Sequence, residues 1–304
     1  MLEPLKVGLF RTFQTVMKTT AGILPYPVPG LLTGPGSVKQ LAENISVRGL
    51  KHVLLVTDQG LTSINLPAGF QATLAERGIG CTVFDGVEPN PTIENIEDGV
   101  RVYKQNGCDC IVAFGGGSPM DCAKGIGARI GNSLLSVRQM EGLFRVVLPI
   151  PPFFCVPTTA GTGSECTIVA VITDASTHEK FVITDLKLVP RIAVLDPELM
   201  VGLPPHITAA TGMDALTHAV EAYIGRSGTP FTDDNAERAV RLIFANLEEC
   251  YKNGKNLDAR YQMALASYCA GAAFTRAYIG YVHAIAHNMG GLYGVPHGLA
   301  DAIS

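Results

Sequence analysis

Short apolar runs alternate with amphipathic segments between residue 50 and about residue 198. The apolar run at residues 51–58 predicts a buried strand, and apolar side chains recur at steps of three and four along residues 93–106, as on one face of a helix. Similar patterns predict strands at residues 80–85, 110–114, 154–156 and 191–197, and helices at residues 67–78 and 122–130. Strands that alternate with helices form parallel βαβ units with both sheet faces covered. We therefore predict an α/β unit with a mostly parallel sheet.

From residue 204 onward the pattern becomes helix after helix, rich in alanine, with no convincing strand. We place a domain boundary near residue 198, which divides the chain into an α/β unit (1–198) and an all-helical unit (199–304). Residues 1–30 predict a short peripheral helix followed by a Pro-rich segment; a weak transit peptide is the less favoured alternative.

A glycine run at the end of a predicted strand is the first candidate site. Gly115, Gly116, Gly117 and Ser118 precede a predicted helix, and such a turn presents backbone N–H groups and a helix N-terminus to a phosphate. A second loop at residues 157–165 is rich in Thr, Gly and Ser and forms another polar edge. Neither loop matches the GxGxxG or the P-loop pattern, which disfavours an ordinary Rossmann dehydrogenase and a P-loop NTPase.

Acidic and histidine side chains recur at helical spacing in the second half. Asp214 and His218 are four residues apart, as are His283 and His287, so each pair shares a helix face. His297 follows after a Gly-rich turn. A carboxylate and several neutral imidazoles suit a divalent metal ion, and together these residues favour such a site over isolated core histidines.

Composition and charge narrow the function classes further. The chain has 304 residues, 47% of them apolar and 16% charged, and a formal net charge of -4. This balance excludes intrinsic disorder and gives no electrostatic footprint for nucleic acid or an anionic membrane. The eight cysteines contain no CxxC pair, so we expect reduced, mostly buried thiols and a cytoplasmic protein.

The motifs as a set resemble those of the iron-containing (group III) alcohol dehydrogenases. The matching segments lie in the family's order at residues 33–36, 56–58, 85–92, 115–121, 157–165, 180–181, 212–218 and 283–298. The resemblance implies a Rossmann-like cofactor domain, a helical metal-binding domain, and an active site in the cleft between them.

The resemblance also implies roles for individual residues. It assigns the metal to Asp214, His218, His283 and His297, and it places His287 near the reacting carbon without binding the metal. Because an imidazole suits proton transfer near neutral pH, we take His287 as the candidate catalytic proton relay. It assigns the NAD contacts to Asp58, Gly115, Gly116, Gly117, Ser118, Thr158, Thr159 and Lys180. Asp58 ends a predicted strand, where its carboxylate would accept hydrogen bonds from ribose hydroxyls and repel a 2′-phosphate.

The expected reaction is reversible, NAD-dependent and Fe²⁺-dependent oxidation of a primary alcohol to an aldehyde, with Zn²⁺ as the alternative metal. A homodimer or larger homo-oligomer is expected from the same resemblance. Family members continue through several helices after the last metal motif, so we expect a C-terminally truncated helical domain. Two other functions stay open: a metal-dependent lyase or hydrolase on the same scaffold, and a truncated, non-catalytic nucleotide-binding paralogue.

Overall fold

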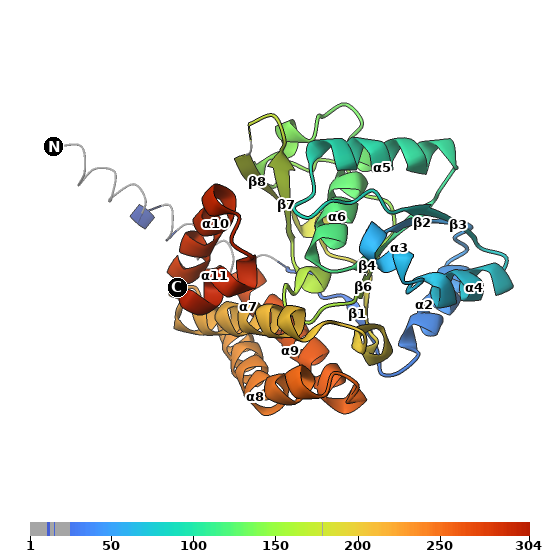
Figure 1. Ribbon diagram of the computed structural model, residues 1–304. Helices are drawn as coiled ribbons and strands as arrows, with labels where there is room; N and C mark the ends of the chain where they lie inside the picture. The colour runs from blue at the N-terminus through green and yellow to red at the C-terminus, as the bar shows by residue number, and fades with distance from the viewer. Residues whose placement is uncertain (1–10, 13–14, 16–24, 178) are drawn as a thin grey trace.

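The computed structural model describes residues 11, 12, 15 and 25–304 except residue 178 (Figure 1). The helix or transit peptide considered for residues 1–30 falls mostly outside the described residues. In the part of the chain that is described, no helix combines the length and the apolar character needed to cross a membrane.

Six strands form one parallel sheet in the order β1-β9-β6-β4-β2-β3, which confirms the predicted α/β class. Five of these strands coincide with the predicted runs to within one residue or lie inside them, whereas β1 was not predicted, because it is a short, largely exposed edge strand. The strands are β1 (Gly30–Thr33), β2 (His52–Val56), β3 (Gly80–Phe84), β4 (Cys110–Gly115), β6 (Phe153–Pro157) and β9 (Ile192–Leu195).

Helices cover both faces of this sheet. Leu54 and Val56 of β2 pack into a core shared with two helices on one face, while Val53 and Leu55 pack into a core on the other face. This two-sided burial explains why the strands are continuous apolar runs. The first core includes α5 (Ile93–Gln105) and α6 (Gly117–Gly131), and the second includes α2 (Ser37–Val47) and α4 (Ala68–Glu76). A short helix, α3 (Gln59–Ser63), follows β2 directly.

A second, three-stranded sheet was not predicted. It has the order β5-β8-β7, with β5 at Gly142–Leu143, β7 at Val169–Asp174 and β8 at Glu179–Thr184. The pair β7–β8 is antiparallel, so it does not follow the strand–helix alternation on which the prediction relied. Ile172 and Ile183 join the core on the α6 side, and Lys180 lies on β8 opposite Thr173.

After β9 and a short 3-10 helix (Pro197–Met200), only helices follow, as predicted. Figure 1 shows them gathered on one side of the sheet. Ala193 and Leu195 of β9 contribute to their alanine-rich core, and Gly163 approaches Gly271 so closely that a Cβ at residue 163 would lie 2.6 Å from its Cα. The helices are α7 (Pro205–Ile224), α8 (Pro230–Lys252), α9 (Leu257–Ala277), α10 (Tyr281–Tyr293) and α11 (His297–Ile303).

Two charged side chains are fully buried where the second glycine loop meets α6 and α9. The Lys124 ammonium donates to Ser164 Oγ at 2.9 Å, to Thr167 Oγ1 at 2.8 Å and to the Val169 carbonyl at 2.8 Å. Neither carboxylate oxygen of Glu165 has a hydrogen-bond partner among the described residues. Burial raises the pKa of Glu165 to about 7.

Candidate metal centre and cofactor site

The glycine run forms a tight turn from β4 directly into α6. Gly115 ends the strand with a φ of 155°, and a Cβ there would lie 2.6 Å from Cγ of Pro119. The helix begins at Gly117, five residues before the predicted start, because Pro119 in its first turn is compatible with a helix N-terminus. The N-cap residue Gly116 has no side chain to satisfy the first N–H groups, which therefore stay available to an anion.

The second loop faces this turn. A Cβ at Gly116 would lie 3.3 Å from Thr159 Oγ1, and one at Gly117 would lie 2.9 Å from Thr162 Cγ2. Thr158 donates its backbone N–H to the Gly115 carbonyl at 3.0 Å. The buried Thr159 hydroxyl has no hydrogen-bond partner in the described part of the chain, so it can serve a ligand. The two loops thus form one polar edge. Because the glycines there have no side chains, a ligand can approach the backbone closely.

A chain of hydrogen bonds leads from the glycine turn to Lys180. The Ser118 hydroxyl oxygen accepts from the Asn90 backbone N–H at 3.3 Å, and the Asn90 side-chain oxygen accepts from Lys180 Nζ at 2.7 Å. Burial lowers the pKa of Lys180, and its positive charge in turn lowers the pKa values of His287 and His297. Lys180 therefore connects two parts of the site: hydrogen bonds link it to the glycine turn, and its charge acts on His287 and His297.

Asp58 follows β2 at the carboxyl edge of the sheet, where open α/β sheets bind ligands. Its Oδ1 accepts a hydrogen bond from the Leu61 backbone N–H at 3.0 Å and so caps the short helix α3. The residue is only half-buried. A local capping role and a contact to a ligand are both compatible with this position, because the cap uses only one of the two carboxylate oxygens.

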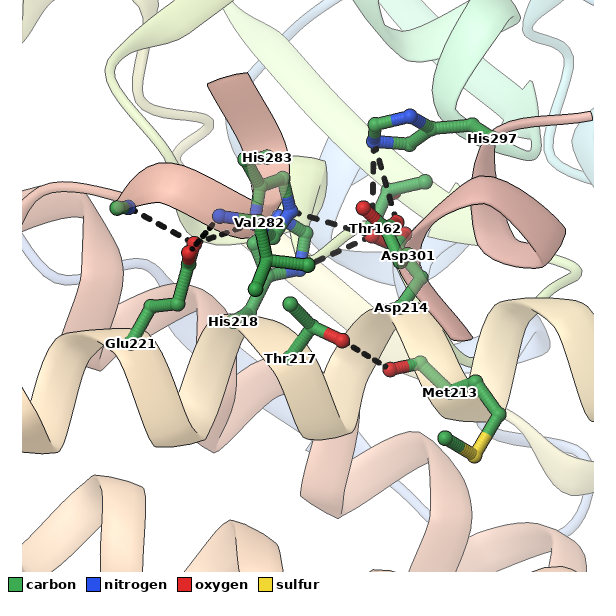
Figure 2. Close-up of polar contacts among 12 residues, drawn as sticks. Thr162, Met213, Asp214, Thr217, His218, Glu221, Val282, His283, His297 and Asp301 are labelled. Carbon is green, nitrogen blue, oxygen red and sulfur yellow. Dashed lines mark hydrogen bonds and ion pairs between the residues drawn. The ribbon is translucent and has the colours of Figure 1, made fainter. Parts of the chain in front are cut away.

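The four residues expected to bind metal lie together, although α7 is separated from α10 and α11 by two long helices (Figure 2). Oδ1 of Asp214 lies 3.6 Å from His218 Nδ1, 3.5 Å from His283 Nε2 and 3.7 Å from His297 Nε2. A Cβ on Gly298 would lie 2.0 Å from the Ala210 carbonyl oxygen, so glycine at this position lets α11 pack directly on α7.

The donor atoms of this cluster fit a divalent metal ion. Asp214 Oδ1, His218 Nδ1 and His283 Nε2 are buried, and none has a hydrogen-bond partner among the described residues. Unpaired buried polar atoms are costly, and a cation between them would remove that cost. Carboxylate oxygen and imidazole nitrogen suit iron, zinc and manganese.

The charges of the cluster also suit metal binding. Burial would raise the pKa of Asp214, but His218, His283 and His297 together hold it below its usual value. Burial lowers the pKa of His218 to about 4 and also lowers that of His297. Burial would lower the pKa of His283 too, but Asp214, Asp301 and Glu221 raise it, so a metal ion would displace a proton from this histidine. An ionised carboxylate and neutral imidazoles are the forms that bind a metal.

His287 lies beside the cluster. Its ring centroid is 4.8 Å from that of His297 and 6.3 Å from that of His283. Burial, followed by electrostatic interactions with His297, His283 and Lys180, lowers the pKa of His287 to about 4. The imidazole is therefore neutral at pH 7 and able to accept a proton.

Two buried carboxylates at this site were missed in the sequence. Asp301 follows His297 by four residues, and its donor atom, with those of Asp214, His283 and His297, forms a group whose atoms all lie within 4.8 Å of one another. Glu221 follows Asp214 by seven residues, and its Oε2 lies 2.7 Å from His283 Nδ1. Helical spacing was an available signal for both, since positions four and seven residues apart share a helix face.

Comparison with known proteins agrees with this arrangement. Residues 29–197 match the model for "iron-containing alcohol dehydrogenase", and residues 208–304 match the model for the C-terminal part of the same family. The chain is 47% identical to the 1,3-propanediol dehydrogenase of Klebsiella pneumoniae over 91% of its own length and 72% of the relative's. It is 40% identical to the NAD-dependent methanol dehydrogenase of Bacillus methanolicus, over the same two fractions.

Solved structures give the same result. A 1,3-propanediol oxidoreductase superposes with a TM-score of 0.88 at 46% identity, over 92% of this chain and 74% of the other. A sulfoacetaldehyde reductase from Bifidobacterium kashiwanohense, solved in complex with NAD⁺, superposes with a TM-score of 0.85 at 31% identity, over the same two fractions. The resemblance is confirmed: the chain belongs to the iron-containing alcohol dehydrogenase family and is an oxidoreductase that acts on a small alcohol with NAD and a metal.

Proposed function

We propose that this enzyme oxidises a primary alcohol to its aldehyde, and catalyses the reverse reduction, with Fe²⁺ at the histidine–aspartate cluster. The observation that carries the proposal is the convergence of unpaired, buried donor atoms from Asp214 and His283 near Lys180, which hydrogen bonds through Asn90 connect to the glycine turn. The names of the relatives support small primary alcohols, and 1,3-propanediol is the first substrate to test.

Each group has a proposed role. Gly115, Gly116, Gly117 and Ser118 would hold the NAD pyrophosphate with backbone N–H groups, and Thr158, Thr159, Lys180 and Asp58 would contact the rest of the cofactor. Asp214, His218, His283 and His297 would hold the cation. When bound, the cation would act as a Lewis acid on the substrate oxygen, and NAD would accept the hydride from the adjacent carbon.

The proton released from the alcohol hydroxyl needs an acceptor, and we assign that role to His287. Its imidazole is neutral at pH 7 and only partly buried, so it can take up this proton and pass it to water. In the reverse direction the same nitrogen returns a proton to the oxygen. Lys180 would bind next to the cofactor and keep His287 unprotonated through its positive charge.

We further propose a cytoplasmic homodimer or larger homo-oligomer. All eight cysteines are free, which supports a reducing compartment. The 3-10 helix between β9 and α7 supports a division into a cofactor-binding unit at residues 1–198 and a metal-binding unit at residues 199–304.

The test is NAD reduction, followed by absorbance under anaerobic conditions, with purified protein reconstituted with Fe²⁺ or Zn²⁺ and a panel of primary alcohols. We expect activity that requires both NAD and the metal, is higher with Fe²⁺, and is lost in His283→Ala. Turnover that does not need NAD would favour the lyase or hydrolase alternative. Failure of the metal-loaded protein to turn over any alcohol would favour the non-catalytic one.

A further inference from the structure

Asp301 is a buried carboxylate that the assignments above leave without a role. Its side chain is fully buried, and neither of its oxygens has a hydrogen-bond partner among the residues that the structure describes. It lies on α11, four residues after His297, and points toward Asp214 and His297 (Figure 2). An ionised carboxylate in such a place is strongly destabilising unless a cation accompanies it.

The distances match those of a shared cation. Asp301 Oδ2 lies 3.5 Å from His297 Nε2, and the group formed with Asp214 and His283 has all its donor atoms within 4.8 Å of one another. Donors that bind one metal ion at about 2.1 Å are at most roughly 4.2 Å apart, so side-chain shifts of a few tenths of an ångström would close the group around an ion.

His218 is placed differently. Its ring stacks between Phe274, at 4.1 Å between centroids, and His283, at 4.2 Å. Its Nδ1 contacts Asp214, but His218 is not part of the compact four-atom group. Asp301 thus belongs to the compact donor group although the family resemblance assigns it no role.

The negative charges around the cluster also favour a cation beside Asp301. Asp214 and Asp301 both present carboxylate oxygens to the same space, and such a pair repels itself when no cation lies between its members. We propose that Asp301 is a further direct ligand of the catalytic metal ion, in addition to Asp214, His218, His283 and His297. This inference rests on the proposed metal-dependent function.

The experiment compares Co²⁺ binding to the metal-free wild-type protein, Asp301→Asn and Asp301→Ser, by titration and by the visible absorption of the bound ion. Asp214→Asn is the positive control. Asp234→Asn removes a charge from an exposed position on α8 and is the matched negative control. We expect both Asp301 variants to bind Co²⁺ at least tenfold more weakly, with an altered spectrum, and Asp234→Asn to match the wild type.

Thermal unfolding separates a ligand from a merely structural residue. Without metal, Asp301→Asn should melt at the same temperature as the wild type or higher, because it removes the repulsion between the carboxyl groups of Asp301 and Asp214; with Co²⁺ it should melt lower. If both Asp301 variants kept the Co²⁺ affinity and spectrum of the wild type while Asp214→Asn lost binding, the Asp301 assignment would be wrong. The assignment of the metal site itself would stand. A wild-type protein that binds no Co²⁺ would overturn the metal site itself.

Discussion

Glu221 Oε2 lies 2.7 Å from Nδ1 of His283, and the same carboxylate accepts backbone N–H groups from Gly280 at 2.8 Å and from Val282 at 2.7 Å. These hydrogen bonds hold the pKa of Glu221 below its usual value although burial would raise it. An ionised carboxylate has no proton to give, so the proton between the two side chains is on Nδ1 of the imidazole. In the neutral imidazole, the lone pair of His283 Nε2 then faces Asp214 and is available to a metal ion.

Replacing Glu221 by alanine should weaken metal binding. The imidazole of His283 would lose the partner that fixes its tautomer and ring orientation, and loss of such a partner costs about 10–100-fold in affinity. Glu221→Gln keeps an acceptor for Nδ1 and should restore part of the loss. Competition with a chromophoric chelator measures the affinity, and Glu237→Gln on the exposed face of α8 is the control. Wild-type affinity in a folded Glu221→Ala protein would contradict the role.

Replacing His287 by glutamine should slow turnover without releasing the metal. A lost acid–base group typically reduces the rate by about 10²–10⁴-fold, whereas His287 lies outside the compact donor group. We expect kcat to fall by at least tenfold, the pH profile of kcat to change shape, and Co²⁺ affinity to stay within threefold of the wild type. His206→Gln changes an exposed histidine and should leave all three unchanged. If His287→Gln released the metal instead, His287 would be a ligand.

Replacing Asp58 by serine should relax the preference for NAD over NADP. Serine preserves an N-cap for α3 but removes the negative charge that would repel a 2′-phosphate. We expect the ratio of kcat/KM for NADP to that for NAD to rise on the order of tenfold, since close charge repulsion is worth a few kcal/mol at most. Asp98→Asn on α5 is the charge-matched control. An unchanged ratio would mean that Asp58 only caps the helix.

The stability of the protein should fall between about pH 4.5 and pH 7 because of Glu165. The native state holds a proton on this buried carboxyl up to about pH 7, whereas the unfolded chain releases it near the ordinary value of 4.5. The stabilisation is complete below the unfolded pKa and is lost as the pH rises through the folded pKa, a change of roughly 3 kcal/mol in the free energy of unfolding.

Glu165→Gln should remove this dependence, because the amide stays neutral at every pH in the window. Denaturant unfolding at pH 5 and pH 8 gives the difference in stability between variant and wild type at each pH. We expect that difference to move in favour of the variant by 1 kcal/mol or more between the two pH values, a conservative share of the full effect. A difference that does not depend on pH would mean that Glu165 is ionised in the native state, paired with Lys124.

The parallel sheet could be predicted from the sequence because each of its inner strands is buried on both faces and appears as an apolar run. The edge strand β1 has no such signal, since it is largely exposed and pairs with the distant strand β9. The antiparallel pair β7–β8 is a local hairpin, but its strands are only partly buried and so do not appear as continuous apolar runs. The residues of the two glycine loops could also be predicted from the sequence. The predicted start of α6 was wrong, because glycines at the beginning of a helix have the composition of a loop.

Only part of the candidate site could be predicted from the sequence. Spacing places His283 and His287 on one helix face but does not show which of the two would bind the metal. Burial distinguishes them, since His283 is 1% exposed and His287 lies nearer the surface. Asp301 repeats the four-residue spacing of Asp214 and His218 and could have been found by that rule. The hydrogen bond between Lys180 and Asn90 joins residues 90 positions apart, and no local pattern indicates it.

The close packing of Gly298 against Ala210 makes α11 and the metal centre a single thermodynamic unit. His297 and Asp301 reach the cluster only while this short helix is docked on α7, so the binding energy of a cation also resists local opening of α11. Amide hydrogen exchange in α11 should consequently slow as the cation is added and accelerate on chelation. Exchange rates in this one helix would then report occupancy of the centre in the absence of any alcohol or nucleotide.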